Sequence, residues 1–453
     1  MKKTITLLLI ITLCNLSYSQ CWKKIASGSE FTLGIKPDGT LWTWGWNGYG
    51  VLGNGTTSHV NTPTKIGVST NWEKIAGGTY HSAAIKADGT LWTWGKNTNG
   101  QLGNGSLVDS YVPVQIGVSA WKEVSLGINH SLGIKNDGSL WAWGDNGTAQ
   151  FGNGTGSSGS STPIQIGVDL NWKSVVAGYE QSYATKTDGT LWFWGKNFYP
   201  TPATTVPTQV GIASDWKSIS GCYLHIIGLK TDNTLWALGF NSHGQLGDGT
   251  NITVASPAPS QIGVDTWLNI SAGYYHSLAV KSDHTLWPWG RNTFNTLGDG
   301  TTTESHIPIQ IGIDTNWLLV SGDEPNSFAL KTNGSLYSWG LNFHGQMGDG
   351  TNVDKSTPTF ISCSTSSSIT SDSSLKYNES IVLYPNPASD YININKSKFN
   401  HIEKVTITDF LGREVIHVTG NEGNIKVDAL TPGVYIVSVY NDGIRYQEKI
   451  IKK

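Results

Sequence analysis

A motif of about 50 residues recurs seven times along most of this chain. Each copy opens on a tryptophan, and successive opening tryptophans stand 44 to 51 residues apart. The seven opening positions are Trp22, Trp72, Trp121, Trp172, Trp216, Trp267 and Trp317. Self-similarity at this period indicates a solenoid or a propeller, in which a repeat buries its apolar face only against its neighbours.

Each copy contains four short segments with the character of β-strands. In the second copy, HSAAIK and LWTWG flank the pair Asp88-Gly89, which predicts a hairpin because both residues tolerate positive φ. WEKIA before them and VPVQIG after them supply two further extended segments. Four strands in each of seven repeats predict an all-β fold, a closed seven-bladed β-propeller.

Two columns of the repeat accompany this hairpin. The turn pair recurs or is replaced by other turn-forming pairs at Asp38-Gly39, Asp137-Gly138, Asp188-Gly189, Asp232-Asn233, Asp283-His284 and Asn333-Gly334. A lysine closes the second segment of every copy, at Lys36, Lys86, Lys135, Lys186, Lys230, Lys281 and Lys331.

Nineteen of the 20 tryptophans fall into three columns: the opening position and the two aromatic positions of the LWxWG segment. A tryptophan that recurs at one place in every repeat is expected to pack between blades, burying about 150–250 Å². Trp46 alone lies outside the columns, which leaves it available for function.

The shared pattern, WxxIAxGxxHSLAxKxDGTLWxWGxNxxGQLGxGT, resembles the repeat of the regulator of chromosome condensation family from about Trp22 to Ile361. The resemblance implies a seven-bladed propeller. It implies no single activity, because the family includes nuclear exchange factors and secreted bacterial binding proteins. A guanine-nucleotide exchange activity is the least favoured interpretation. The formal net charge of −3, without a basic stripe, also disfavours nucleic acid as a partner.

The first 19 residues have the character of a signal peptide. Lys2 and Lys3 precede a short apolar run, and small residues precede Gln20, where we expect cleavage. The run is too short to span a membrane as a helix, so we expect no transmembrane segment. Lipid attachment at Cys21 is the alternative to simple cleavage.

The mature chain would hold three cysteines. Cys21 stands just before the first opening tryptophan, and Cys363 stands two residues after the last predicted strand. A closed ring makes these two positions neighbours, so we predict a disulfide between them in an exported protein. Cys222 replaces a recurring glycine and is expected to be a buried thiol outside this bridge.

The chain changes character after the propeller, which we place at residues 20–363. Residues 364–376 are Ser-rich and predict a linker, and residues 377–453 carry alternating segments that predict a small C-terminal β-sandwich. Its YPNPASDYI, DFLGREV and LTPGVYIVSV segments resemble the type IX secretion C-terminal sorting domain of Bacteroidota. The resemblance implies the type IX secretion machinery as a partner, passage through the periplasm, and release or display at the cell surface.

No group of residues in the sequence indicates catalysis. The column of His81, His130, His225 and His276 is interpreted as structural, and we expect no metal or cofactor. The recurring LGDGT segments supply one carboxylate each, far from the six to eight oxygens that calcium takes, and are interpreted as turns.

The loop between the first two strands differs between copies and carries aromatic and acidic residues. With Trp46, the candidate binding residues are Tyr80, Tyr179, Tyr223, Tyr274, Tyr275, Glu30, Glu180, Asp323 and Glu324. Rigid aromatic residues are typical of recognition surfaces, so we predict a non-enzymatic binding or adhesion module for an extracellular protein or a glycan. Two alternatives remain open. The tyrosines could only cover the blade edges, or the carboxylates could serve a secreted enzyme that acts on glycans.

Overall fold

The computed structural model describes residues 21–196, 203–252, 256–323, 325–362, 383–394, 402–409, 414–420, 423–441 and 444–453. These residues form strands and no helix, so none of them builds a helix able to cross a membrane. Contacts divide the chain after residue 363 into two compact units. The predicted signal peptide, the linker 364–376, Cys363 and Glu324 lie outside the described residues.

Five repeats of the first unit each form a four-stranded antiparallel sheet whose strands pair in chain order. The first sheet contains β1 (Lys24–Gly28), β2 (Phe31–Ile35), β3 (Leu41–Gly45) and β4 (Val60–Lys65). The same order recurs in β5 (Trp72–Gly77), β6 (His81–Lys86), β7 (Leu91–Gly95) and β8 (Ser110–Gln115); in β9 (Trp121–Leu126), β10 (His130–Lys135), β11 (Leu140–Gly144) and β12 (Ser160–Ile166); in β13 (Trp172–Ala177), β14 (Gln181–Lys186), β15 (Leu191–Gly195) and β16 (Thr204–Gln209); and in β23 (Trp317–Asp323), β24 (Asn326–Lys331), β25 (Leu336–Gly340) and β26 (Lys355–Ile361).

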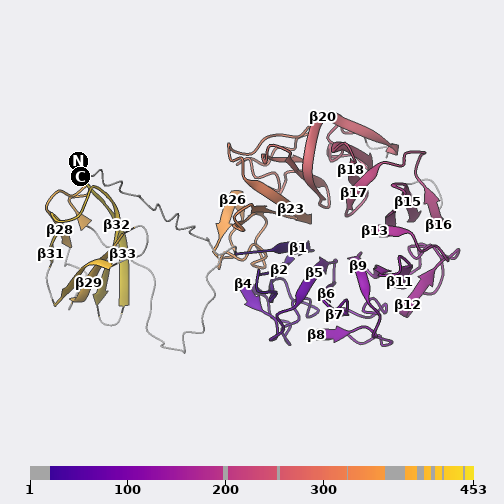
Figure 1. Ribbon diagram of the computed structural model, residues 1–453, viewed down its shortest axis with the longest axis horizontal. Helices are drawn as coiled ribbons and strands as arrows, with labels where there is room; N and C mark the ends of the chain where they lie inside the picture. The colour runs from indigo at the N-terminus through magenta and orange to yellow at the C-terminus, as the bar shows by residue number, and fades with distance from the viewer. Residues whose placement is uncertain are drawn as a thin grey trace, which may run out of the picture. The chain divides into compact units, whose positions relative to one another are not determined.

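Repeats five and six share one six-stranded sheet. It contains β17 (Trp216–Gly221), β18 (His225–Lys230), β19 (Thr234–Gly239), β20 (Ser256–Ala272), β21 (His276–Lys281) and β22 (Leu286–Gly290). The long β20 is the outer strand of repeat five and continues as the inner strand of repeat six. In Figure 1 the first strands of the repeats, such as β1, β5 and β9, surround the centre, while β4, β8 and β12 lie at the periphery. The sheets are consistent with the predicted seven blades. The prediction of four strands in every repeat was wrong for repeat six, where, among the described residues, only the isolated bridges Leu286–Ile311 and Gly290–Ser305 stand in place of a fourth strand.

Contacts between the first and last repeats close the ring. The hydroxyl of Thr32 donates a hydrogen bond to the carbonyl of Gln346 at 2.9 Å, and the hydroxyls of Ser27 and Ser321 are 2.8 Å apart. Trp22 is buried in one cluster with side chains of repeat seven. The fold is therefore a closed propeller, because an open solenoid would keep these residues apart.

The hairpins between the second and third strands share one geometry. Gly39 has a φ of 74°, and Asn233 and His284, which replace this glycine, both have a φ of 66°. Only the second residue of each turn pair has a positive φ. The aspartate contributes its side chain instead: Asp38 Oδ1 accepts hydrogen bonds from the amide and hydroxyl of Thr40 at 3.0 and 2.6 Å.

Tryptophan and serine side chains hold neighbouring blades together. Trp94 Nε1 and Ser82 Oγ of repeat two both donate to the carbonyl of Val51 in repeat one, each at 2.7 Å. The equivalent pair in repeat three, Trp143 and Ser131, donates to Gln101 of repeat two, both at 2.9 Å. The interpretation of the tryptophan columns as packing between blades is confirmed.

The histidine column lies at the same contacts between neighbouring blades, which we call the seams. His81 Nε2 is 2.8 Å from Ser131 Oγ of the next repeat, and His225 Nε2 is 2.9 Å from Ser277 Oγ. Because these serines donate their hydroxyl protons to carbonyl groups, each imidazole donates through Nε2. Burial lowers the pKa of His81 and His225 to about 3, so they stay neutral. The column has a structural role.

The second unit contains two sheets around one apolar core. The first holds β27 (Leu383–Tyr384), β28 (Tyr391–Ile394) and β31 (Asn424–Lys426), and the second holds β30 (Glu414–Thr419), β29 (Ile402–Thr408), β32 (Gly433–Asn441) and β33 (Ile444–Lys452). Ile392 of the first sheet and Val405 and Val437 of the second are fully buried in one cluster. This arrangement is consistent with the predicted β-sandwich.

Candidate binding surface

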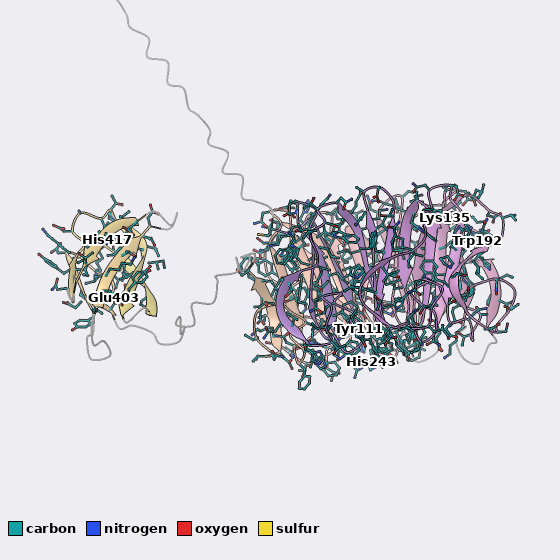
Figure 2. All side chains as sticks on the ribbon, turned by 90° about the horizontal axis from the view of Figure 1, so that it is seen from below. Tyr111, Lys135, Trp192, His243, Glu403 and His417 are labelled. Atoms are coloured by element: carbon teal, nitrogen blue, oxygen red, sulfur yellow. The ribbon has the colours of Figure 1, made fainter. Side chains whose placement is uncertain are left out.

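The antiparallel strands place the loops of each repeat at two opposite rims. The loops after the first and third strands share one rim, where the amide of Trp46 donates to the carbonyl of Glu30 at 2.8 Å. We call it the variable rim. The hairpin after the second strand and the connection to the next repeat share the other, which we call the hairpin rim. Figure 2 shows Tyr111 and His243 on one side of the propeller and Lys135 and Trp192 on the opposite side.

A cavity of about 420 Å³ lies between the first strands of the repeats. Small residues form most of its wall, including Ser27, Ala76 and Gly178. Tyr80, Tyr179 and Tyr274 of the variable rim line it too, together with Cys222 and Asp323. The central cavity therefore opens among several of the predicted binding residues.

Four of these residues form the tyrosine cluster, which consists of Tyr179, Tyr223, Tyr274 and Tyr275. The rings of Tyr223 and Tyr274 stack with centroids 3.9 Å apart at 17°. Tyr179 and Tyr275 stand edge-on to Tyr223, with centroids at 4.8 and 5.2 Å. All four side chains are half-buried, so each keeps surface for a ligand. Loops of three successive repeats thus build one aromatic platform.

Trp46 belongs to a second aromatic group on the same rim. Its ring centroid lies 5.6 Å from that of Tyr49 and 6.1 Å from that of Tyr80. Lys96 Nζ lies 4.8 Å from the centroid of Tyr80. The structure therefore brings Trp46 and Tyr80 together, although they belong to different repeats. We call Trp46, Tyr49, Tyr80 and Lys96 the Trp46 cluster.

Sequence reasoning missed several residues of this surface. Tyr49, Lys96 and His243 lie in or beside loops that follow third strands, and the ring of His243 is 5.0 Å from that of Tyr275. The signal that could have found them is the strand order itself, because antiparallel pairing returns the loop after the third strand to the rim of the loop after the first.

The predicted carboxylates have separate surroundings. Glu30 Oε2 lies 3.2 Å from His344 Nε2, and burial raises the pKa of Glu30. Glu180 forms an ion pair with Lys196. Asp323 Oδ1 accepts a hydrogen bond from Cys222 Sγ at 3.4 Å. Glu30, Glu180 and Asp323 belong to different repeats, and each has a different neighbour.

Cys222 is half-buried rather than buried, which corrects the expectation from the sequence. It lies in the column of glycines whose backbones face the central cavity, so its side chain has open space beside it. Among the described residues, no group of three or more His, Cys, Asp and Glu has the arrangement of a metal site.

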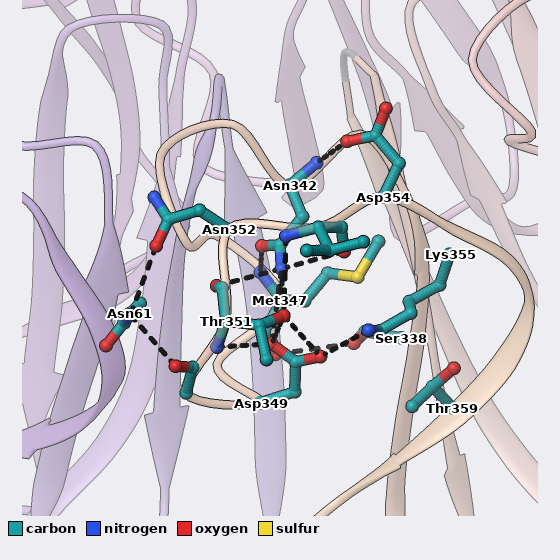
Figure 3. A network of polar contacts seen from close by, with 12 residues as sticks. Asn61, Ser338, Asn342, Met347, Asp349, Thr351, Asn352, Asp354, Lys355 and Thr359 are labelled. Atoms are coloured by element: carbon teal, nitrogen blue, oxygen red, sulfur yellow. Dashed lines mark hydrogen bonds and ion pairs between the residues drawn. The ribbon is translucent and has the colours of Figure 1, made fainter.

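Six of the loops after the third strands, those that the structure describes, are held by one asparagine each. Figure 3 shows Asn342, whose Nδ2 donates to Asp349 Oδ1 at 3.2 Å and to the carbonyl of Thr351 at 3.0 Å. Its Oδ1 accepts from the amide of Met347 at 3.0 Å. Asp349 also contacts Lys355 Nζ at 3.1 Å. The LGDGT segments are turns, and their hydrogen bonds give the variable rim a rigid frame.

The hairpin rim is uniform from repeat to repeat. Lys135 Nζ lies 3.4 Å from the ring centroid of Trp141 and 5.2 Å from that of Trp121, and the other six lysines of the column repeat this pairing with aromatic rings. The connection to the next repeat exposes one apolar side chain by 86–98% at Val68, Val118, Val168, Ile212, Val264 and Ile313.

Comparison with known families identifies both units. The model of the Regulator of chromosome condensation (RCC1) repeat matches residues 38–85, 88–134, 137–185, 232–280 and 333–373, which make up more than half of the chain. A second model of this repeat matches residues 22–51, 72–101, 121–150 and 267–296. The Secretion system C-terminal sorting domain matches residues 382–453.

Solved structures resemble the propeller. Human WBSCR16 is 19% identical with a TM-score of 0.65, and the match covers 71% of this chain and 94% of that one. Yeast RCC1 (Prp20) bound to Kap60 is 21% identical with a TM-score of 0.61, covering 66% and 78%. Prp20p from Saccharomyces cerevisiae is 20% identical with a TM-score of 0.59, covering 66% and 80%. At these identities the likeness shows the fold alone.

Proposed function

This chain belongs to the regulator of chromosome condensation repeat family, and we propose that it works as an exported binding or adhesion module. Its sorting domain indicates export by the type IX secretion system to the medium or the cell surface. We include in the proposal a signal peptide at residues 1–19 and passage through the periplasm. The ligand, an extracellular protein or a glycan, would be held on the variable rim.

The tyrosine cluster carries this proposal. Its rings come from three repeats, keep partly exposed surfaces, and lie beside the central cavity. Tyr and Trp side chains supply contact area at little cost in conformational entropy and dominate many recognition surfaces. The loops that carry the cluster differ in sequence between repeats, whereas the strands below them are nearly constant. Variation on a constant frame is the expected pattern of a binding surface.

Two other functions are not proposed. Prp20p from Saccharomyces cerevisiae binds Gsp1p and histones, but 20% identity supports only a shared fold. A nuclear exchange activity is also hard to reconcile with a sorting domain for export. For a glycan-acting enzyme, the described carboxylates Glu30, Glu180 and Asp323 offer no shared centre.

Binding is tested by capture from culture supernatant and cell envelopes and on a glycan array. The variant with Tyr179, Tyr223, Tyr274 and Tyr275 all changed to Ala is expected to lose capture by about tenfold or more. The control carries Val118→Ser and Val168→Ser on the hairpin rim and should capture as the wild type does. Equal capture by wild type and tyrosine variant would contradict the proposal. A measurable turnover of glycans that Asp323→Asn abolishes would also contradict the binding proposal.

Export is tested separately by deleting residues 377–453. We expect the shortened chain to stay in the cell envelope with a folded propeller, because the two units have separate cores. Fractionation and immunoblotting report its location, and protease resistance reports its folding. Normal release of the shortened chain into the medium would exclude the sorting role.

A further inference from the structure

The central cavity has the properties of a preformed site. Its wall consists mainly of Gly, Ala and Ser residues of the innermost strands, and its volume of about 420 Å³ falls in the ordinary range of ligand pockets, about 300–1,000 Å³. The wall serines hold neighbouring strands: Ser220 Oγ accepts from the amide of Ala272 at 3.0 Å, and Ser271 Oγ from that of Gly322 at 2.9 Å. The wall is therefore rigid, and little ordering is required on binding.

The charge of the lining has one sign. Among the described residues that line the cavity, Asp323 is the acidic one, and Lys, Arg and His are absent. The thiol of Cys222 donates a hydrogen bond to Asp323 Oδ1 at 3.4 Å. Of the cationic side chains of the same rim, Lys196 forms an ion pair with Glu180, and Lys96 lies over the ring of Tyr80. The lining favours a cation over an anion.

The aromatic residues of the lining have the same preference. Tyr80, Tyr179 and Tyr274 line the cavity, and the faces of aromatic rings attract cations. Burial, followed by the charges of Tyr223, Glu180 and Tyr80, raises the pKa of Tyr179, so Tyr80 is near enough to act on it. The protein already uses this chemistry, since Lys96 Nζ lies 4.8 Å from the ring centroid of Tyr80.

We propose that the central cavity binds the protonated amine of a lysine side chain that a protein ligand inserts from the variable rim. The four methylene groups would lie along the Ala and Gly wall, and the ammonium group would reach the Asp323 carboxylate and the tyrosine faces. We choose a lysine over an amino sugar because an unbranched side chain can extend along a wall of Gly, Ala and Ser residues to reach Asp323. The inference rests on the proposed function and names the chemical class of its ligand.

The test is a calorimetric titration of the chain from Gln20 to Lys453 with a five-residue peptide, acetyl-Gly-Gly-Lys-Gly-Gly-amide. Its Nε-acetyl-lysine counterpart, which has lost the charge, should bind about tenfold more weakly or not at all. Free cadaverine and glucosamine serve as the other amines. We expect cadaverine to compete with the peptide and glucosamine to compete less well. Tighter binding of glucosamine than of the peptide would overturn the choice of lysine.

Variants locate the site. Asp323→Asn should weaken peptide binding by about tenfold, and Asp323→Glu, which retains the charge, should restore much of it. Glu73→Gln makes the same chemical change at an exposed residue away from the cavity and should bind as the wild type does. Thermal unfolding of each variant verifies that it is folded, and Tyr179→Leu provides a second probe of the lining.

The outcomes separate this inference from the proposed function. If both peptides bind equally, or if Asp323→Asn and Tyr179→Leu both leave binding unchanged, the lysine site is wrong. In that case, loss of capture by the tyrosine variant would still support binding on the variable rim. If Asp323→Asn and Tyr179→Leu leave peptide binding unchanged, and the variant with all four tyrosines changed also captures its ligand as the wild type does, both the lysine site and the proposed function are refuted.

Discussion

On the hairpin rim the seven repeats carry the same kinds of side chain at the same places, whereas on the variable rim nearly every loop is different. Each lysine of the hairpin rim lies over aromatic rings, and each of the first six turn aspartates accepts hydrogen bonds from the Ser or Thr two residues later. On the variable rim, by contrast, Tyr223 stacks on Tyr274 while Trp46 contacts Tyr80.

The difference between the two rims shows which part of the fold provides its stability. The seams contain the buried tryptophans, serines and histidines, and these lie within the strands rather than in the loops of the variable rim. Loops above a fixed seam can change sequence without removing a contact between blades. The comparison therefore predicts large effects in the seams, moderate effects on the hairpin rim, and losses of binding alone on the variable rim.

The largest expected effect is loss of stability in mild acid. The four seam histidines have their pKa lowered by burial to about 3, against about 6.5 in the unfolded chain. Below pH 6.5 the unfolded chain takes up protons that the folded chain does not, so stability is unaffected above this pH and falls steadily towards pH 3. At pH 5 the loss is about 2 kcal/mol for each histidine.

Urea unfolding at pH 7 and pH 5 measures this loss. His130→Gln should reduce the pH dependence, because repeat four already carries Gln181 at this place in the column. Tyr274→Ala, on the variable rim, should leave the pH dependence unchanged. A free energy of unfolding that stays constant from pH 7 to pH 4 would show that the seam histidines do not make the fold sensitive to acid.

The next effect concerns the predicted disulfide, which would tie the two ends of the ring. Cys21 takes part in a disulfide, which supports the pairing with Cys363. In repeat seven, Cys363 stands where repeat two has Val118. Closing a loop of about 340 residues stabilises by at most about 5 kcal/mol. Cys21→Ser should lower the melting temperature, and peptide mapping without reduction should link the two cysteines in the wild type. A bridge through Cys222 would contradict the pairing.

A single seam tryptophan should matter almost as much. Trp143 is fully buried and donates to the carbonyl of Gln101 in the preceding repeat. Trp143→Ala is expected to cost about 3–5 kcal/mol of unfolding free energy, because it leaves a cavity and an unpaired carbonyl. The half-buried Tyr274→Ala should cost clearly less while weakening ligand capture. Equal destabilisation by the two changes would remove the distinction between seam and variable rim.

The smallest effect is expected on the hairpin rim. Lys135→Met keeps the apolar stem over Trp141 but removes the charge above the ring, at a cost of about 0.5–1 kcal/mol. Denaturant titration should resolve this change, and ligand capture should stay at the wild-type level. Loss of ligand capture by Lys135→Met would place the binding site on the hairpin rim and contradict its location on the variable rim.

The repeats, the hairpins, the tryptophan columns and the sorting domain could all be predicted from the sequence. Each depends on chemistry that lies close together in the chain, such as Asp38 accepting from Thr40, or on a pattern that recurs at a fixed period. One expectation about the candidate site was wrong. Cys222 was expected to be buried, but it is half-buried and lines the central cavity, which forms only when the repeats close into a ring.

Only the tertiary structure decided which residues of the variable rim meet. Tyr179, Tyr223 and Tyr274 are separated by 44 and 51 residues in the chain, yet their rings touch, because the loops of successive blades converge on the axis of a closed ring. Cys222 and Asp323 meet for the same reason, two repeats apart. The sequence by itself determined the repeat and its turns, since these depend on neighbours along the chain. The binding surface depends on distances across the ring, which closure alone sets.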